Sequence, residues 1–252
     1  MLTEGFLEEV LARAGLSAPV RFEEVTRSTN ETALAMADEG APEWTLVAAA
    51  HQTAGRGRLG RTWLDEPGRS LMFSLVLRPR LPAERVGLLS LLAGTAAANS
   101  ARECGATHAW CKWPNDLFVG EEKAGGVLAE ARLVRERVEH VVVGVGINLG
   151  EPPPGLEGAG AVVAAAPGEL LEAYLRFFRH KYQPEHPAFA AAVVAGYREV
   201  CGTIGRSVRA VTVDGRSVEG TAVGVDAAGG LVLDIGARTA TVAFSEIQHL
   251  ER

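Results

Sequence analysis

The run from Gly55 to Arg61 concentrates residue types that bind anions. It reads Gly-Arg-Gly-Arg-Leu-Gly-Arg, with three arginines, three glycines and no acidic residue. Guanidinium groups form paired hydrogen bonds with phosphate or carboxylate oxygens, and glycines let backbone N–H groups approach an anion closely. The run does not match the P-loop pattern, and a solvated basic turn is the alternative. We therefore predict a loop that becomes ordered around a negatively charged ligand.

Two further motifs bring charged residues close to turns. Residues 112–117 read Lys-Trp-Pro-Asn-Asp-Leu, and a rigid proline turn there would present Lys112 and Asp116 to a cleft. Lys123 opens a strand just before two glycines, which permit close approach to the backbone. An ordinary turn and a surface lysine beside a bulge are the respective alternatives.

The remaining two motifs are glycine-rich or polar. Gly144 and Gly146 interrupt the apolar run 141–149, which predicts either a bulky planar ligand lying on the strand or a β-bulge. The triplet at 28–30, Ser-Thr-Asn, precedes a helical segment, and helix capping alone explains it.

Hydrophobic periodicity and turn residues define the elements that must position these motifs. Helices are predicted at 2–14, from the triplet 28–30 to about Glu39, and at 82–103, 168–181 and 187–200. Strands are predicted at 20–25, 45–50, 71–77, 109–112, 117–119, 123–132 and 139–147. Residues 150–160 are predicted to form a loop. Strands and helices do not alternate regularly, so we predict an α+β fold with a mixed β-sheet and not a Rossmann fold.

The pattern changes near Gly202. Short valine-rich runs alternate there with turn residues such as Asp214-Gly215, which is typical of a small antiparallel barrel. A unit of this size is expected to pack on the main domain, because it buries little core of its own. We place the two domains at 1–203 and 204–252.

Composition excludes several classes of protein. The net charge of −6 argues against a dedicated nucleic-acid binder. The three cysteines are widely spaced, which suggests a reducing compartment and buried or half-buried thiols. The sequence contains neither a long apolar run typical of a membrane span nor a basic, apolar leader. We therefore expect a cytoplasmic protein with no membrane partner.

Together, the order and spacing of these motifs resemble the biotin–protein ligase family, also called biotin–[acetyl-CoA-carboxylase] ligase. The resemblance runs from about Phe22 to the C-terminus. It implies a class II synthetase-like catalytic domain for biotin and ATP, followed by an SH3-like barrel. Some members carry an N-terminal DNA-binding domain, and this chain resembles the monofunctional type without it. Position 59 is Leu where other members can carry arginine, and the segment 244–249 matches the family only loosely.

The resemblance also implies a reaction and its partners. Members activate biotin with ATP to biotinyl-5′-AMP, release pyrophosphate, and transfer biotin to a lysine of a biotin carboxyl carrier protein, a subunit of acetyl-CoA carboxylase. ATP and biotin are substrates, and Mg²⁺ is expected, without assigned ligands. No nucleic-acid partner is expected, and a homodimer is left open.

Family roles transfer to this chain residue by residue. The expected catalytic residues are Lys123, Arg58 and Asp116. The expected biotin-binding residues are Ser28, Thr29, Asn30, Gln52, Arg56, Gly57, Arg58, Lys123, Gly126, Gly144 and Gly146. The expected ATP-binding residues are Arg56, Arg58, Arg61, Trp63, Lys112, Asn115, Lys123 and Asn148. In this scheme Trp63 stacks on adenine, the glycines at 144 and 146 clear space for biotin, and residues 52–69 form a lid that ligands order.

Other functions stay open on the sequence alone. A lipoate–protein ligase shares the adenylate chemistry, but its Arg-Arg-x-Ser-Gly-Gly-Gly type of motif is absent. A ligand-sensing or nucleic-acid-binding regulator would use the 55–61 loop on phosphates. A non-catalytic adaptor built on the C-terminal barrel would leave Lys112, Asp116 and Lys123 unexplained.

Overall fold

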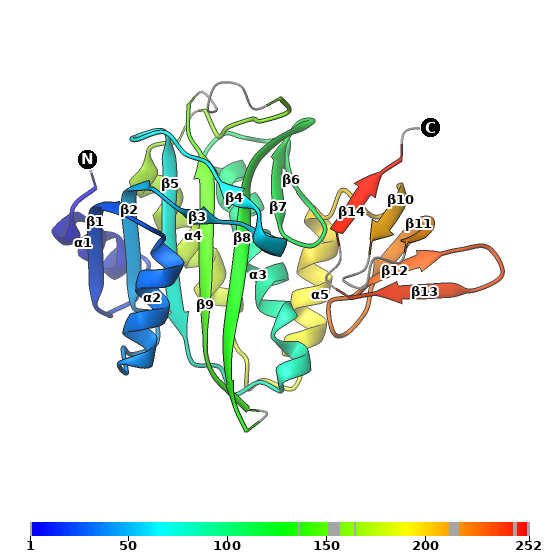
Figure 1. Cartoon of the computed structure of the whole chain (residues 1–252), viewed down its shortest axis with the longest axis horizontal. Helices are drawn as coiled ribbons and strands as arrows, with labels where there is room; N and C mark the ends of the chain where they lie inside the picture. Colours follow the sequence, from blue (N-terminus) through cyan, green and yellow to red (C-terminus); the bar gives the residue numbers. More distant parts are fainter. Residues whose placement is uncertain are drawn as a thin grey trace.

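A seven-stranded mixed sheet forms the centre of the computed structural model, which describes residues 2–135, 137–150, 157–163, 165–211, 217–243 and 246–250. Its strand order is β1-β2-β5-β9-β8-β7-β6 (Figure 1). The strands are β1 (Val20–Thr26), β2 (Leu46–Gln52), β5 (Ser70–Leu77), β6 (Ala109–Lys112), β7 (Asp116–Val119), β8 (Glu122–Val134) and β9 (Arg137–Asn148). β1 and β2 run parallel, and the other neighbours pair antiparallel, which confirms the predicted mixed sheet.

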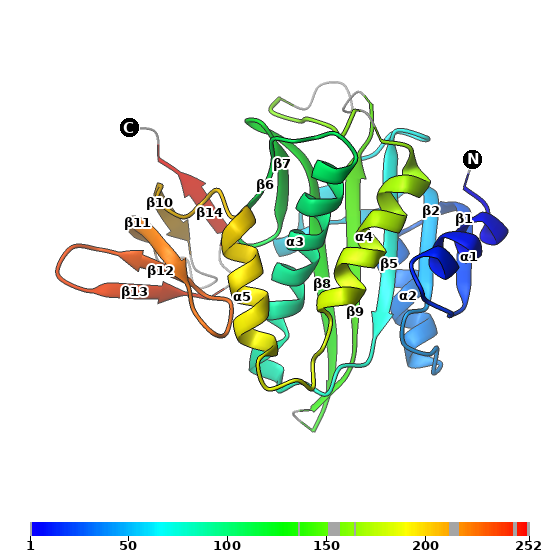
Figure 2. The same ribbon diagram turned by 180° about the vertical axis from the view of Figure 1, so that it is seen from behind.

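Helices cover both faces of this sheet. α2 (Thr29–Asp38) lies on one face, and α1 (Glu4–Arg13), α3 (Gly87–Glu103) and α4 (Pro167–Lys181) lie on the other (Figures 1 and 2). Every residue of β5 is buried, because this central strand has helices on both sides. Its nearly continuous apolar sequence is what such a position requires.

One predicted helix start and one predicted helix cap differ from the structure. Pro82 is extended (φ −61°, ψ 146°), so residues 83–85 form only a 3₁₀ turn and α3 begins at Gly87. The side chain of Ser28 does not cap α2; the side chain of Gln52 does so instead, since its Oε1 accepts the backbone N–H of Thr29 at 2.7 Å. A long-range partner thus replaces the local cap that the triplet 28–30 predicted.

The C-terminal strands form a separate five-stranded antiparallel sheet in the order β13-β12-β11-β10-β14, as predicted. They are β10 (Ser207–Val211), β11 (Ser217–Val225), β12 (Leu231–Asp234), β13 (Thr239–Val242) and β14 (Glu246–His249). The predicted turn at 214–215, residues 151–156 of the predicted loop, and residues 244–245 of the tail lie outside the described residues.

The small sheet docks on the main domain through α5 (Phe189–Val200) and the turn before β7. Trp113 in that turn is fully buried, its backbone N–H donates to Thr203 Oγ1, and its Nε1 donates to Gly229 O, both at 3.0 Å. Arg198 on α5 donates to Val225 O at 2.9 Å. The barrel is therefore fastened to the same turn that carries Asn115 and Asp116.

The three cysteines are free; Cys111 and Cys201 are buried and Cys104 is half-buried, as expected. Burial raises the pKa of each thiol, so all three favour the protonated, unreactive form. Within the described part of the chain, no helix has the length and apolar character needed to cross a bilayer.

Candidate functional site

A cavity of about 210 Å³ lies on the α2 side of the sheet. Its walls come from the start of α2, the arginine loop, the turn before β7, and the middle of β8 and β9. Most predicted site residues line it: Ser28, Thr29, Asn30, Gln52, Arg56, Gly57, Arg58, Arg61, Trp63, Lys112, Asn115, Asp116, Lys123, Gly126, Gly144 and Gly146. Asn148 does not. The tertiary structure thus gathers motifs more than a hundred residues apart into one site.

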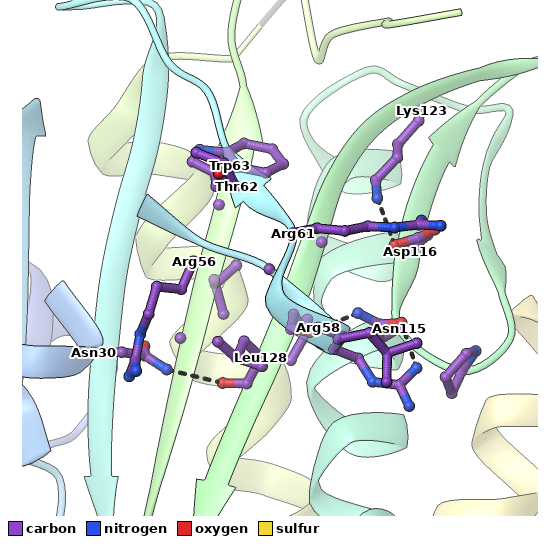
Figure 3. Close-up of a pocket in the computed structure, with 18 of the residues that line it drawn as sticks. Asn30, Arg56, Arg58, Arg61, Thr62, Trp63, Asn115, Asp116, Lys123 and Leu128 are labelled. Atoms are coloured by element: carbon purple, nitrogen blue, oxygen red, sulfur yellow. Dashed lines mark hydrogen bonds and ion pairs between the residues drawn. The ribbon is translucent and has the colours of Figure 1, made fainter. Parts of the chain in front are cut away.

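The arginine loop folds as a small hairpin over this cavity. β3 (Gly55–Arg56) pairs with β4 (Thr62–Trp63), and a 3₁₀ turn at Arg58–Gly60 joins them. The hairpin divides its arginines between the two ends of the cavity: Arg56 extends toward Asn30, Arg58 turns toward Asn115, and Arg61 extends toward the Asp116 end (Figure 3). One loop therefore places arginines at both ends, and at the Asn30 end the charge of Arg56 is paired with Glu130.

The end near β7 is strongly cationic. Lys123 Nζ lies 2.7 Å from Asp116 Oδ1, and Arg58 Nη1 donates to Asn115 Oδ1 at 3.2 Å. Asn115 Nδ2 donates to Val127 O at 2.7 Å, which fixes its amide orientation. Asp116 is the single carboxylate among the described lining residues, and this end holds four basic ones: Arg58, Arg61, Lys112 and Lys123. This balance favours an anionic ligand.

The opposite end is a network of neutral polar groups around the start of α2. Ser74 Oγ lies 2.6 Å from Asn30 Oδ1 and 2.8 Å from Thr29 Oγ1, and Thr29 in turn contacts Gln52 Oε1. Asn30 Nδ2 donates to Glu130 Oε2 at 2.8 Å and to Leu128 O at 3.3 Å. Such a network suits a neutral ligand group that both donates and accepts hydrogen bonds.

Sequence reasoning missed Ser74 and Glu130. Ser74 had a signal, because it is a polar residue within the apolar run 71–77 and is fully buried. Glu130 lies in an ordinary strand, and its importance comes from contacts with Asn30 and Arg56, which are far away in the sequence. Pattern analysis has no access to such contacts.

The glycines of β9 give space to protein side chains. A Cβ on Gly144 would lie 1.9 Å from Asn30 Oδ1, and a Cβ on Gly146 would lie 2.8 Å from the indole of Trp63. The structure therefore explains both glycines through Asn30 and Trp63. The sequence analysis expected these glycines to leave space for biotin itself, and that role stays a prediction.

Two residues expected at the nucleotide keep an unused polar atom. The indole Nε1 of Trp63 and Oδ1 of Asn148 are buried without a hydrogen-bond partner among the described residues. Asn148 lies at the end of β9, and its Nδ2 donates to Gly160 O at 3.0 Å. It lies outside the cavity lining, so its ATP-binding role stays a prediction.

The C-terminal barrel also reaches the cavity, through Ile247 on β14. Its neighbour His249 stacks on Trp110 of β6 at 6.1 Å, and Arg206 lies over the same ring. Burial, and then the nearby cations Lys112 and Arg206, lower the pKa of His249 from 6.5 to about 4. The loose sequence match of this tail gave no reason to expect Ile247 at the site.

Another polar cluster, Asp38, Glu139 and His140, lies away from the cavity lining. Arg132 pairs with both of its carboxylates, at 2.6 Å from Asp38 and 3.0 Å from Glu139. A guanidinium group thus already supplies the positive charge that these acids attract.

The mixed sheet, the cavity that favours an anion and the docked C-terminal sheet are the architecture of the protein ligases that handle biotin or lipoate. Comparison with known proteins agrees. Residues 22–148 match the biotin/lipoate A/B protein ligase family, and residues 203–250 match the biotin protein ligase C-terminal domain. The chain belongs to this family, and the resemblance read from its motifs is confirmed.

Relatives extend the match over nearly the whole chain. The bifunctional ligase/repressor BirA of Bacillus subtilis is 32% identical over 245 residues, 91% of this chain and 75% of that protein. The biotin–[acetyl-CoA-carboxylase] ligase of Mycobacterium tuberculosis is 34% identical over 239 residues, 89% of this chain and 86% of that protein. With the second family match, these relatives confirm the prediction that the chain is an enzyme of the biotin protein ligase type.

A solved structure supports the same fold. The biotin protein ligase from Aquifex aeolicus, in complex with biotin and ATP, superimposes with a TM-score of 0.75 at 24% identity. The match covers 92% of this chain and 99% of that one. The predicted order of a mixed catalytic domain followed by a small antiparallel C-terminal domain is thereby confirmed.

Proposed function

We propose that this chain activates biotin with ATP to form biotinyl-5′-AMP, and then transfers biotin to a lysine of a biotin carboxyl carrier protein. The observation that carries the proposal is the division of the cavity into a neutral hydrogen-bonding end and a cationic end. Biotin has the same division, with a neutral ureido ring and a carboxylate tail. The family match and the names of the relatives support the same substrate.

The neutral end accounts for binding of the ureido ring. A ureido group offers two N–H donors and one carbonyl acceptor, and Ser28, Thr29, Asn30 and Gln52 supply side-chain groups of both kinds. Thr29 and Asn30 are themselves held by Ser74, which limits the entropy lost when a ligand binds. The carboxylate tail then extends toward Lys123.

The cationic end accounts for the first chemical step. An oxygen of the biotin carboxylate attacks the α-phosphorus of ATP, the bond from that phosphorus to the β-bridging oxygen breaks, and pyrophosphate leaves with the electron pair. Both reactants are anions and repel each other. Lys123 and Arg58 offset this repulsion and stabilise the charge that develops on the phosphoryl oxygens. Arg61 and Lys112 add positive charge for the phosphates.

Mg²⁺ fits the donor set of this cavity in the manner usual for nucleotide sites. Mg²⁺ is commonly bound by one or two carboxylates and by substrate phosphates, and Asp116 offers a carboxylate at the phosphate end. When bound, the ion would neutralise phosphate charge. Asp116 and Lys123 would then share the neighbourhood of the α-phosphate.

The second step forms an amide. The neutral amine of the carrier lysine attacks the acyl carbon of biotinyl-5′-AMP, the bond from that carbon to the phosphate oxygen breaks, and AMP leaves. The attacking nitrogen must lose a proton, and Asp116 is our candidate acceptor, since its carboxylate lies beside Lys123. The hairpin at 55–63 covers the mixed anhydride and excludes water.

Pyrophosphate release tests the activity directly. The protein is mixed with ATP, Mg²⁺ and biotin, and separately with lipoate in place of biotin. Release that depends on biotin, followed by addition of one biotinyl group to a carrier domain in mass spectrometry, is expected. Release with lipoate alone would favour the lipoate-ligase alternative. Salt-sensitive DNA binding without pyrophosphate release would favour a regulator.

The lid has a test of its own. We expect limited proteolysis within residues 52–69 to slow when biotin and ATP are both present. Cleavage at the same rate with and without both ligands would reject a lid that ligands order.

A further inference from the structure

The carboxylate of Glu130 connects two elements of the site: helix α2, which begins at the neutral end of the cavity, and the hairpin that forms the lid. Glu130 on β8 accepts from Asn30 Nδ2 at 2.8 Å, and both of its carboxylate oxygens accept from Arg56 Nη2, at 2.9 and 2.7 Å. Asn30 belongs to the first turn of α2 and Arg56 to the hairpin over the cavity (Figure 3). Three segments separated in sequence therefore meet at Glu130.

Glu130 also fixes which way the Asn30 amide faces. The Nδ2 group of Asn30 meets Glu130 Oε2 and Leu128 O. A backbone carbonyl oxygen never donates a hydrogen bond, and neither does an ionised carboxylate, so both atoms act as acceptors. Oδ1 of Asn30 must then face Ser74, whose hydroxyl donates to it at 2.6 Å. A rotated amide would bring an oxygen against two acceptors.

The surroundings leave the Asn30 side chain little freedom. Asn30 is 4% exposed, and its Oδ1 occupies the space that a Cβ on Gly144 would take. Ser74 is fully buried on β5. The amide is thus held from β5, β8 and β9 at once, and Glu130 is the single charged member of that set of contacts.

The ion pair with Arg56 has a different consequence. The side chains of Arg56 and Glu130 are 38% and 29% exposed, and a single Arg nitrogen serves both carboxylate oxygens. Charge-assisted hydrogen bonds of this type are stronger than neutral ones. They fasten β3 of the lid to β8 at the neutral end, while Arg58 and Arg61 extend toward the phosphate end (Figure 3).

We infer that Glu130 is a positioning residue for the proposed reaction, which orients Asn30 for the ureido group and anchors the lid through Arg56. The orienting role rests on the proposed function, because it concerns the ureido group of biotin. The anchoring role does not depend on which ligand binds. Arg56 then acts mainly as the anchor of the lid, and Arg58 and Lys123 carry the charge that meets the reacting groups. Ser74 is the second positioning residue, acting on Asn30 and on its neighbour Thr29 but not on the lid.

Three substitutions separate the two roles. Glu130→Gln keeps an oxygen that accepts from Asn30 but removes the charge that holds Arg56. Ser74→Ala removes the donor to Asn30 Oδ1 and the contact with Thr29 Oγ1, and leaves the lid contact intact. Glu130→Ala removes both interactions. The control is Glu219→Gln, which breaks the more exposed Arg209–Glu219 pair of the C-terminal sheet, whose side chains are 46% and 53% exposed.

The first measurement is hydrogen exchange at residues 53–63 without any ligand. Exchange is expected to become about tenfold faster in Glu130→Gln and Glu130→Ala, because a tenfold change corresponds to losing the stabilisation that a charged hydrogen bond typically provides. Exchange in Ser74→Ala and Glu219→Gln is expected to stay unchanged. Unchanged exchange in Glu130→Ala would overturn the anchor. This result does not depend on the identity of the substrate.

The second measurement is steady-state pyrophosphate release. Ser74→Ala and Glu130→Ala are expected to raise the KM for biotin by about tenfold with little change in kcat, because they affect binding of the neutral end. Glu130→Gln is expected to keep a nearly normal biotin KM and to release free adenylate faster. A uniform fall in kcat with unchanged KM in all three would overturn the orienting role. Absence of any biotin-dependent release by the unsubstituted protein would instead reject the proposed function.

Discussion

Lys123 and Asp116 form an ion pair at the cationic end of the cavity, with Nζ 2.7 Å from Oδ1, and they come from neighbouring strands β8 and β7. Each is partly exposed, so the pair remains open to ligand. In the proposed reaction a carboxylate and a phosphate approach Lys123, and the ammonium group exchanges Asp116 for these anions. The pair thus keeps a reactive lysine oriented before substrates arrive.

Replacing Lys123 tests this arrangement. Lys123→Gln keeps much of the side-chain length but removes the positive charge, and we expect biotin-dependent pyrophosphate release to fall by at least about a hundredfold. Lys181→Gln, at the exposed end of α4, is the matched control and should retain normal activity. Release within a few fold of normal in Lys123→Gln would show that this charge does not act on the reacting groups.

Two alanine substitutions on β9 should separate the substrates. Gly144→Ala pushes Asn30 from its position, so we expect a higher KM for biotin; Gly146→Ala pushes Trp63, so we expect a higher KM for ATP. Each effect should exceed about tenfold, because the added carbon has no room. Gly196→Ala in α5, where the nearest atom is at 3.9 Å, is the control. Equal effects on both substrates would contradict the separate roles.

Trp113 offers a test of how the barrel is fastened. Trp113→Phe removes the donor to Gly229 O and part of a fully buried ring, and we expect the free energy of unfolding to fall by about 2–4 kcal/mol. Denaturant unfolding followed by circular dichroism measures this change. An unchanged midpoint would mean that the contact adds nothing to stability.

Titration of His249 should make the stability of the folded protein depend on pH. Its pKa is about 4 in the folded protein and near 6.5 when unfolded, so between these values the unfolded chain binds the extra proton. The free energy of unfolding should therefore fall as the pH is lowered from about 6.5 to about 4. Titration of one group changes the free energy of unfolding by at most about 1.4 kcal/mol per pH unit, and solvent screening at this partly exposed site makes the change smaller.

Burial also lowers the pKa of His140, which adds a dependence of the same sign. The measurement is thus the difference between the unsubstituted protein and His249→Phe, which keeps an aromatic ring for stacking on Trp110. The slope of the unfolding free energy against pH should be smaller in His249→Phe. Identical slopes would contradict a titration assigned to His249.

The element pattern was largely predictable because it depends on local sequence. The apolar run 71–77 predicted β5, and amphipathic spacing predicted α4 close to its observed bounds. Local rules failed where a distant group took over: Gln52 caps α2 in place of Ser28. Pro82 began an extended segment and not a helix, because its ψ of 146° lies outside the helical range.

The site was predictable to the extent that its chemistry lies in compact motifs. Lys123, Asp116 and the arginine run were identified from residue types and spacing, and all line one cavity. Glu130 and Ile247 were not identified, since neither belongs to a motif. Their places depend on which strands become neighbours and on how the barrel docks.

The amino-acid sequence by itself determined the family, the mixed α+β organisation and the set of charged groups available for an anionic ligand. The tertiary structure decided how those groups are distributed. Asn30 and Glu130 are 100 residues apart, yet they share a hydrogen bond because α2 packs on β2, β5 and β9, which brings its first turn to the neighbouring strand β8. The hairpin likewise sends Arg56 to Glu130 and Arg58 to Asn115. Such pairings depend on the packing of whole elements, which local propensities do not specify.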